Sequence, residues 1–371
     1  MLAAFLLAAQ VGPAPIDRSP RLRATLPNGA AIGAEVRPTD RRIVLQAVLA
    51  NPEGDRPTEY GQRHLLEHLV AARDPEVDRK LETLGGAMGA STGRDGLRLW
   101  ISVPPDSLNL GLITLRDLLK PITLRSEEVA RERAIVRREI ALLTPEERAG
   151  MAAWRDLYGE AGIDPVGLDA PWDDATPEAL ERLWRGMLIG PRLSLFVAGP
   201  IELDATVERL ERIARTLPDG PRPAWGARAA VKTSAAPGMG TYALAVGPLD
   251  ERTTLAAIAT GLALASEVEG SSLTYSPSPR EGAVILANGA DPESLGRAVR
   301  RGDVGLRNRA LSLARSWLAA KTSNSAESSE IRATLSGFRA GLVPERLASV
   351  LTEVREPDLD AAFARWGTAA R

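Results

Sequence analysis

The stretch His64-Leu65-Leu66-Glu67-His68 contains both histidines of the 371-residue chain. On an α-helix, positions i, i+3 and i+4 lie on one face, so His64, Glu67 and His68 would form a polar stripe. Leucines and a valine surround the stripe, which predicts that the remaining surface of this helix is buried. Buried imidazoles beside a carboxylate are costly unless they are satisfied, so the stripe calls for a chemical explanation.

Two imidazole nitrogens one helical turn apart can bind one zinc ion, and the acid between them can activate a water molecule. The pattern H-x-x-E-H is the signature of the inverzincin peptidases. The alternative is a helix whose two histidines are inert, either capped or salt-bridged. The absence of any other histidine favours the metal site.

A third protein ligand is expected from a carboxylate on another helix. The segment 126–143 opens with Ser126 as a predicted N-cap and has two acids in its first turn. Glu132 and Glu139 fall in line with its apolar residues, at alternating steps of three and four. The alternative for such acids is a solvated charged face.

These residues resemble the pitrilysin/insulinase family of zinc peptidases, and within it the two-domain branch that includes mitochondrial processing peptidase. The resemblance rests on the H-x-x-E-H stretch and on Glu139 at the end of the run Glu132 to Glu139. It implies one Zn²⁺ per chain, held by His64, His68 and Glu139. It also implies Glu67 as general base and Glu132 as the acid that orients a ligand histidine.

The expected fold is α+β, with two related domains that each pack helices on an antiparallel-rich mixed sheet and together form half of a clamshell chamber. We expect a possible signal peptide or disordered N-terminus at 1–18, a catalytic domain at 19–218, a linker at 219–238 and a shortened homologous domain at 239–371. Predicted strands of the first domain include 22–36, broken by a turn at 26–29, then 43–49 and 193–197; a helix is predicted over 204–217.

A glycine-rich hairpin follows the motif helix. A second helix is predicted to end at Gly85-Gly86, ahead of a strand, a turn at 93–96 and a strand over 97–103. The hairpin resembles the segment in which family members bind an extended peptide as an added strand, so Gly89, Ala90, Ser91 and Thr92 are candidate substrate-binding residues. Gly89 stands where the family usually has asparagine. The alternative is an ordinary sheet edge.

The second half repeats the order of elements, with strands predicted at 242–246, 273–276 and 283–287 and a helix at 251–265. In the family, the non-catalytic copy often has an arginine and, seven residues later, a tyrosine that hold the scissile carbonyl. Here Tyr275 matches the tyrosine, but Val268 stands at the arginine position. The resemblance therefore implies a catalytic half that works with a homologous partner subunit supplying the Arg/Tyr pair, or as a homodimer. A packed strand tyrosine is the alternative for Tyr275.

Composition is that of a globular protein, with 44% hydrophobic and 25% charged residues, and the net charge of −2 gives no reason to expect a nucleic-acid partner. No stretch is long enough for an integral membrane segment. With no cysteine, no disulfide fixes the compartment. The apolar run 1–9 resembles a signal-peptide core, which favours a periplasmic or secreted protein over the cytoplasmic alternative.

The sequence thus predicts a zinc-dependent endopeptidase that hydrolyses peptides or unfolded protein segments, acting as the catalytic subunit of a dimer. A non-catalytic structural or peptide-binding subunit that keeps the peptidase fold is the alternative. A purely structural zinc site needs four protein ligands, which a chain without cysteine or a third histidine can hardly assemble.

Overall fold

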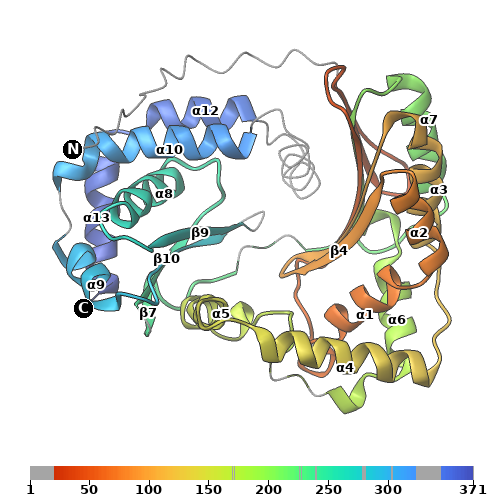
Figure 1. The fold of residues 1–371 in the computed structure, drawn as a ribbon, viewed down its shortest axis with the longest axis horizontal. Helices are drawn as coiled ribbons and strands as arrows, with labels where there is room; N and C mark the ends of the chain where they lie inside the picture. Colours follow the sequence, from red (N-terminus) through yellow and green to blue (C-terminus); the bar gives the residue numbers. More distant parts are fainter. Residues whose placement is uncertain are drawn as a thin grey trace, which may run out of the picture.

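The computed structural model of the chain describes residues 21–322 and 344–370, except 169, 171, 225, 227, 239, 278–280 and 302–303. The possible signal peptide at 1–18 lies outside the described residues. Within them, helices and strands form two halves, each built on its own sheet (Figure 1). The α+β fold class expected from the sequence is confirmed.

A mixed six-stranded sheet organises the first half. Its spatial order is β1-β2-β6-β3-β5-β4; β2 and β6 pair in parallel and the other neighbours pair antiparallel. The strands are β1 (Arg21–Thr25), β2 (Ala31–Val36), β3 (Ile43–Ala50), β4 (Ala87–Gly93), β5 (Gly96–Val103) and β6 (Leu193–Gly199). The strands predicted from alternation and turn residues are therefore present, and β4 lies at the edge of the sheet.

Helices cover one face of this sheet, and the other face is turned toward the second half (Figure 1). On β5, every second residue from Leu97 to Val103 is fully buried against those helices, as expected for a strand with one face in the core. The helices of the first half are α1 (Gln62–Ala71), α2 (Pro75–Thr83), α3 (Leu108–Leu118), α4 (Ser126–Leu142), α6 (Pro177–Met187) and α7 (Leu203–Ala214).

The second half is built on a smaller sheet with a separate hydrophobic core. Its strands lie in the order β7-β8-β10-β9, and all described neighbours pair antiparallel. They are β7 (Ser234–Gly238), β8 (Thr241–Val246), β9 (Ser272–Pro277) and β10 (Gly282–Ala287). The helices are α8 (Arg252–Ala265), α9 (Pro292–Arg301), α10 (Arg307–Thr322), α12 (Pro344–Glu353) and α13 (Glu356–Ala369). Trp366 of α13 is buried at the centre of this core.

Helix α5 (Pro145–Tyr158) joins the two halves. It follows α4 in the chain, yet its buried side chains Trp154 and Tyr158 pack with Ala243 and Ile285 of the second sheet. The Tyr158 hydroxyl donates a hydrogen bond to the Gly282 carbonyl at 2.8 Å. Burial raises the pKa of this hydroxyl, so it stays a donor. The second half is therefore anchored on α5, which directly follows α4, the helix that carries part of the candidate site.

Two local expectations were wrong. The predicted N-cap Ser126 is the first helical residue of α4, and Arg125 is the cap, because its backbone N–H bonds to the Glu128 carboxylate at 2.9 Å. The predicted linker 219–238 ends in strand β7, which begins at Ser234. In the described part of the chain, no helix has the length and apolar character needed to cross a bilayer.

Candidate metal centre

Helix α1 presents the two histidines beside each other. The helix buries Leu65, Leu66 and Val70 completely, which fixes its rotation and turns the opposite face toward α4. His64 and His68 follow one another by one helical turn, and their ring centroids lie 5.1 Å apart at an interplanar angle of 74°. The predicted helix and its polar stripe are therefore present.

Helix α4 brings both predicted glutamates to this face. Glu132 is buried in line with Val129 and Val136, as the sequence pattern predicts. Glu139 lies at the margin of the same seam, where about half of its side chain is exposed (49%). A carboxylate in that position can reach the histidines and still be accessible to solvent.

Three potential ligand atoms converge between the two helices. The Glu139 Oε2 atom lies 3.1 Å from His68 Nε2 and 3.6 Å from His64 Nε2, and the three residues offer ligand atoms within 4.8 Å of one another. Zinc bonds of about 2.0–2.2 Å in tetrahedral geometry would separate ligand atoms by roughly 3.3–3.6 Å. The donor set and its spacing therefore fit a single zinc ion.

A hydrogen bond at His64 and a longer contact at His68 orient the two rings. His64 Nδ1 lies 2.9 Å from the Val166 carbonyl oxygen, which can only accept, so Nδ1 carries the proton and the Nε2 lone pair points toward Glu139. His68 Nδ1 lies 3.6 Å from Glu132 Oε2, on the side away from Glu139. Glu132 thus has the position of an orienting acid and Glu139 that of a ligand.

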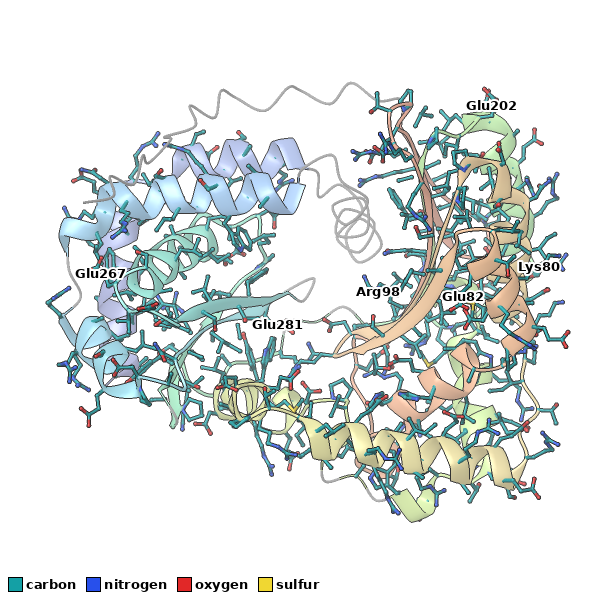
Figure 2. All side chains as sticks on the ribbon, viewed as in Figure 1. Lys80, Glu82, Arg98, Glu202, Glu267 and Glu281 are labelled. Carbon is teal, nitrogen blue, oxygen red and sulfur yellow. The ribbon has the colours of Figure 1, made fainter. Side chains whose placement is uncertain are left out.

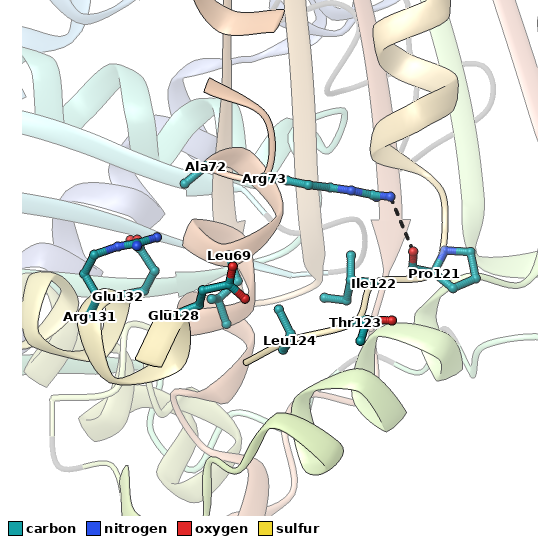
Figure 3. A pocket seen from close by; sticks show the side chains of 10 residues that line it. All are labelled: Leu69, Ala72, Arg73, Pro121, Ile122, Thr123, Leu124, Glu128, Arg131 and Glu132. Atoms are coloured by element: carbon teal, nitrogen blue, oxygen red, sulfur yellow. Dashed lines mark hydrogen bonds and ion pairs between the residues drawn. The ribbon is translucent and has the colours of Figure 1, made fainter. Parts of the chain in front are cut away.

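Glu132 also borders a pocket of about 350 Å³ behind α1 and α4 (Figure 3). Arg131 lines the same pocket, and its Nε donates to Glu132 Oε1 at 3.0 Å. Arg73, on the far side, donates to the Pro121 carbonyl. The buried Glu132 carboxylate therefore lies between an imidazole and a guanidinium, which makes its burial tolerable.

The carbonyl that holds His64 belongs to a loop that the sequence did not single out. In this loop Asp164 Oδ1 accepts from the Val166 N–H at 3.0 Å, and Asp164 Oδ2 pairs with Arg94 Nη2 at 2.8 Å. Arg94 also lies over the Trp154 ring, 4.3 Å from its centroid. Burial lowers the pKa of Arg94, and Asp164 only partly offsets this. The only local signal is the Asp164-Pro165 turn, because a backbone carbonyl leaves no trace in residue type.

Glu67 leaves α1 on the face shared by the two histidines. Its side chain is half-buried and forms no hydrogen bond or ion pair with the described residues. Its carboxylate is therefore not engaged by any described residue.

The candidate substrate residues Gly89 to Thr92 lie on β4, the edge strand. Thr92 is hydrogen-bonded to α1, since its hydroxyl donates to the Arg63 carbonyl at 3.4 Å. At Gly89, a Cβ atom would lie 2.7 Å from the Trp100 ring, which explains the glycine. The structure thus places the open sheet edge beside the start of α1.

The second-half residues do not join this cluster of ligand atoms. Tyr275 lies on β9, half-buried against the second core, and Val268 lies in the turn after α8. Valine has no hydrogen-bonding side chain, so position 268 does not supply the guanidinium that the resemblance implies for the scissile carbonyl.

Sequence comparison gives a family match over the metal-site helices. Residues 54–155 match the profile of the family described as Insulinase (Peptidase family M16). The protein named coenzyme PQQ synthesis protein F of Pseudomonas putida is 26% identical over 195 residues, which cover 48% of this chain and 25% of that protein. The match thus extends over about a quarter of the length of this relative.

Comparison of folds gives matches over nearly the whole chain. A protease from Helicobacter pylori has a TM-score of 0.75 at 14% identity, covering 93% of this chain and 96% of that one. A peptidase M16 inactive domain from Pseudomonas fluorescens has a TM-score of 0.70 at 14% identity, with coverages of 92% and 94%. The periplasmic protease PqqL from Escherichia coli has a TM-score of 0.67 at 14% identity, with coverages of 94% and 46%.

The matched profile includes His64, His68 and Glu139, whose ligand atoms the fold brings together. The matches at 14% identity show similarity of fold alone, and this similarity covers both halves of the chain. By its sequence match over residues 54–155 and by its fold, the chain is similar to the insulinase family, peptidase family M16.

Proposed function

We propose that the chain is a zinc-dependent endopeptidase subunit that hydrolyses extended peptides or unfolded protein segments. The observation that carries the proposal is the convergence of His64 Nε2, His68 Nε2 and Glu139 Oε2. One zinc ion there would act as a Lewis acid and lower the pKa of a water molecule toward neutrality.

The chain's own residues supply the proton chemistry. Glu67 accepts the proton of the attacking water and passes it to the leaving amine, which its position on the ligand face of α1 allows. The Val166 carbonyl and Glu132 keep the Nδ1 atoms of both rings engaged, so that the Nε2 atoms face the ion.

The peptide would bind as an added strand at β4. This edge strand has one side without a partner strand among the described residues, so its backbone N–H and C=O groups can pair with an extended segment. Because Thr92 is bonded to the backbone of α1, such a segment would pass beside the metal ligands.

The ion is the first thing to test, by zinc content per purified chain. About one tightly held zinc is expected for the natural sequence and clearly less for Glu139→Gln, with Glu127→Gln, an exposed acid of the same helix, as the matched control. Glu67→Gln should keep the zinc and lose peptide cleavage. Full cleavage by Glu67→Gln would remove Glu67 from the role of base.

A second subunit is proposed because Val268 replaces a carbonyl-binding arginine. The chain aligns with 46% of PqqL, so its fold corresponds to part of a larger peptidase. We expect the isolated chain to be nearly inactive, since one missing oxyanion donor costs on the order of 10²- to 10³-fold in kcat. Cleavage should rise when a histidine-free homologue with the Arg/Tyr pair is added; full turnover by a purified monomer would contradict the proposal.

The remaining proposals concern organisation and compartment. The separate cores support a division into 19–218 and 239–371, with α5 contributing to the second core although it lies in the first range. A periplasmic or secreted location is supported by the apolar run at 1–9 and by the periplasmic PqqL relative.

A non-catalytic peptide-binding subunit is the second candidate. The specific observation in its favour is the similarity to an M16 inactive domain, together with Gly89 and Val268 at two positions where the family has polar residues. The two candidates differ in one result: the non-catalytic subunit would bind peptides without cleaving them, with or without a partner.

A further inference from the structure

Two residues face each other on the β4–β5 hairpin, Gly89 and Trp100. They are direct partners in the antiparallel register, as are Ser91 and Arg98, and directly opposed residues share one face of the sheet. Leu99 and its alternate neighbours on β5 point into the core, so Trp100 and Arg98 point to the other face. Figure 2 labels Arg98 on the side of the sheet turned toward the second half.

The Trp100 indole lies across Gly89. A Cβ atom on residue 89 would be 2.7 Å from Cζ2, 2.8 Å from Cε2 and 2.9 Å from Nε1 of the indole, distances that no side chain could occupy without moving the ring. The indole is only half-buried, and its Nε1 has no hydrogen bond to the described residues. Only a glycine at position 89 therefore leaves room for the Trp100 indole to lie over the edge strand.

Nothing on this face of β4 screens the indole from a neighbouring strand. The face carries only Ala87, Gly89, Ser91 and Gly93, and β4 is the last strand of its sheet among the described residues. Strands are spaced about 4.8 Å apart, so a ring that spans Gly89 reaches toward the side chains of a segment added at the free edge. Ser91 accepts from Arg98 Nε at 3.0 Å, which keeps that arginine beside the next position.

We propose that Trp100 determines substrate specificity, and that it selects extended peptides with a large apolar or aromatic side chain at the position that passes Gly89. This inference rests on the proposed function, because it needs a peptide added at β4. A large side chain on this face packs on the indole, whereas glycine or a small polar residue leaves the ring in water.

The peptide position that passes Gly89 lies close to the candidate metal centre. Arg63 donates to the Gly93 carbonyl at 2.5 Å, and its own carbonyl accepts from Thr92, so the end of β4 is bonded to the residue that precedes His64. The preference should therefore concern a residue near the cleaved bond.

The test uses extended fluorogenic peptides that carry Phe, Leu, Ser or Gly at each position in turn, with the zinc-loaded chain and its partner. Binding is measured in parallel with the zinc-loaded Glu67→Gln variant. At one position Phe and Leu should be preferred by roughly tenfold or more in kcat/KM, mainly through KM, a size typical of one apolar contact. Trp100→Ala should abolish that preference, and Trp100→Phe should retain it.

Gly89→Ser provides an independent variant, because its side chain displaces the ring without removing it. It should lose the same preference. Trp317→Ala, which removes a half-buried indole from the second half, is the matched control and should keep it. Thermal unfolding of each variant checks that the hairpin is folded.

The outcomes separate this inference from the function on which it rests. If Trp100→Ala cleaves or binds the peptides with the same order and size of preference as the natural sequence, Trp100 does not determine specificity. That result leaves the peptidase proposal intact. A zinc-loaded chain that neither binds nor cleaves any peptide of the set, alone or with its partner, refutes both.

Discussion

The two histidines are fixed by different kinds of partner. The Nδ1 atom of His64 is bonded to a backbone carbonyl, whereas the Nδ1 atom of His68 faces the Glu132 carboxylate. A carboxylate increases the basicity of the imidazole and holds its orientation. Glu132 should therefore contribute to metal affinity although it is not one of the three ligands.

We expect Glu132→Gln to lower zinc affinity by about 10- to 100-fold, because the amide keeps the shape but removes the negative charge next to His68. Competition with a chromogenic chelator measures the change. The exposed Glu127→Gln on the same helix should have no effect. An unchanged affinity in Glu132→Gln would mean that the carboxylate does not orient the ring.

Helix α1 and the loop that holds His64 are packed without space between them. Gly61, the N-cap of α1, has φ +78°, and a Cβ there would lie 2.6 Å from the Ala170 Cβ and 3.1 Å from the Gly167 Cα. The start of the metal helix is thereby pressed against the loop that carries Val166. The position of the His64 ring follows from this contact.

Gly61→Ala should destabilise the chain by about 2–4 kcal/mol, because it combines about 1–2 kcal/mol of left-handed backbone strain with a clash that displaces the loop. Gly54→Ala is the matched control: its φ is +79°, but nothing lies within 4 Å of the added Cβ. Urea unfolding of both variants isolates the packing contribution. If both variants lose the same unfolding free energy, the loop moves away from the added Cβ at position 61 without an energetic cost.

Across the whole molecule, a buried ionic contact links the two halves next to the hairpin turn. Arg228 Nη1 lies 2.9 Å from Asp95 and 2.5 Å from Glu281, which belongs to the second half (Figure 2). Burial alone would lower the pKa of Arg228, but the two carboxylates outweigh it and raise the pKa. The same hairpin turn includes Arg94, which is paired with the His64 loop.

We expect Arg228→Met to cost about 3–5 kcal/mol of unfolding free energy, because it leaves two carboxylates buried without their cation. Adding Glu281→Gln to that variant should recover part of the loss. A double-mutant cycle by chemical denaturation measures the coupling, which should exceed about 1 kcal/mol for residues in one network. Additive effects of the two substitutions would show that Arg228 does not connect the halves.

The sequence determined by itself what depends on periodicity and on turn residues. The polar stripe of α1 and the hairpin 87–103 follow from spacing that local geometry translates directly into structure, whereas the edge position of the first hairpin strand was expected from the family resemblance. The two candidate histidine ligands stood out because the chain has no other histidine, whereas Glu139 was singled out as the third candidate by the family resemblance. The cap of α4 was misplaced by one residue, since Arg125 can cap through its backbone as Ser126 could through its side chain.

Only the tertiary structure decided which distant segments support those residues. The Val166 carbonyl that orients His64 has no sequence signal, and the packing of α5 on the second sheet contradicts its place in the chain. In the sequence, Gly89 is only a position where the family's polar side chain is missing. The structure shows that the Trp100 ring occupies the space of that side chain. Such contacts depend on how whole surfaces fit together, so residue type and spacing along one segment cannot specify them.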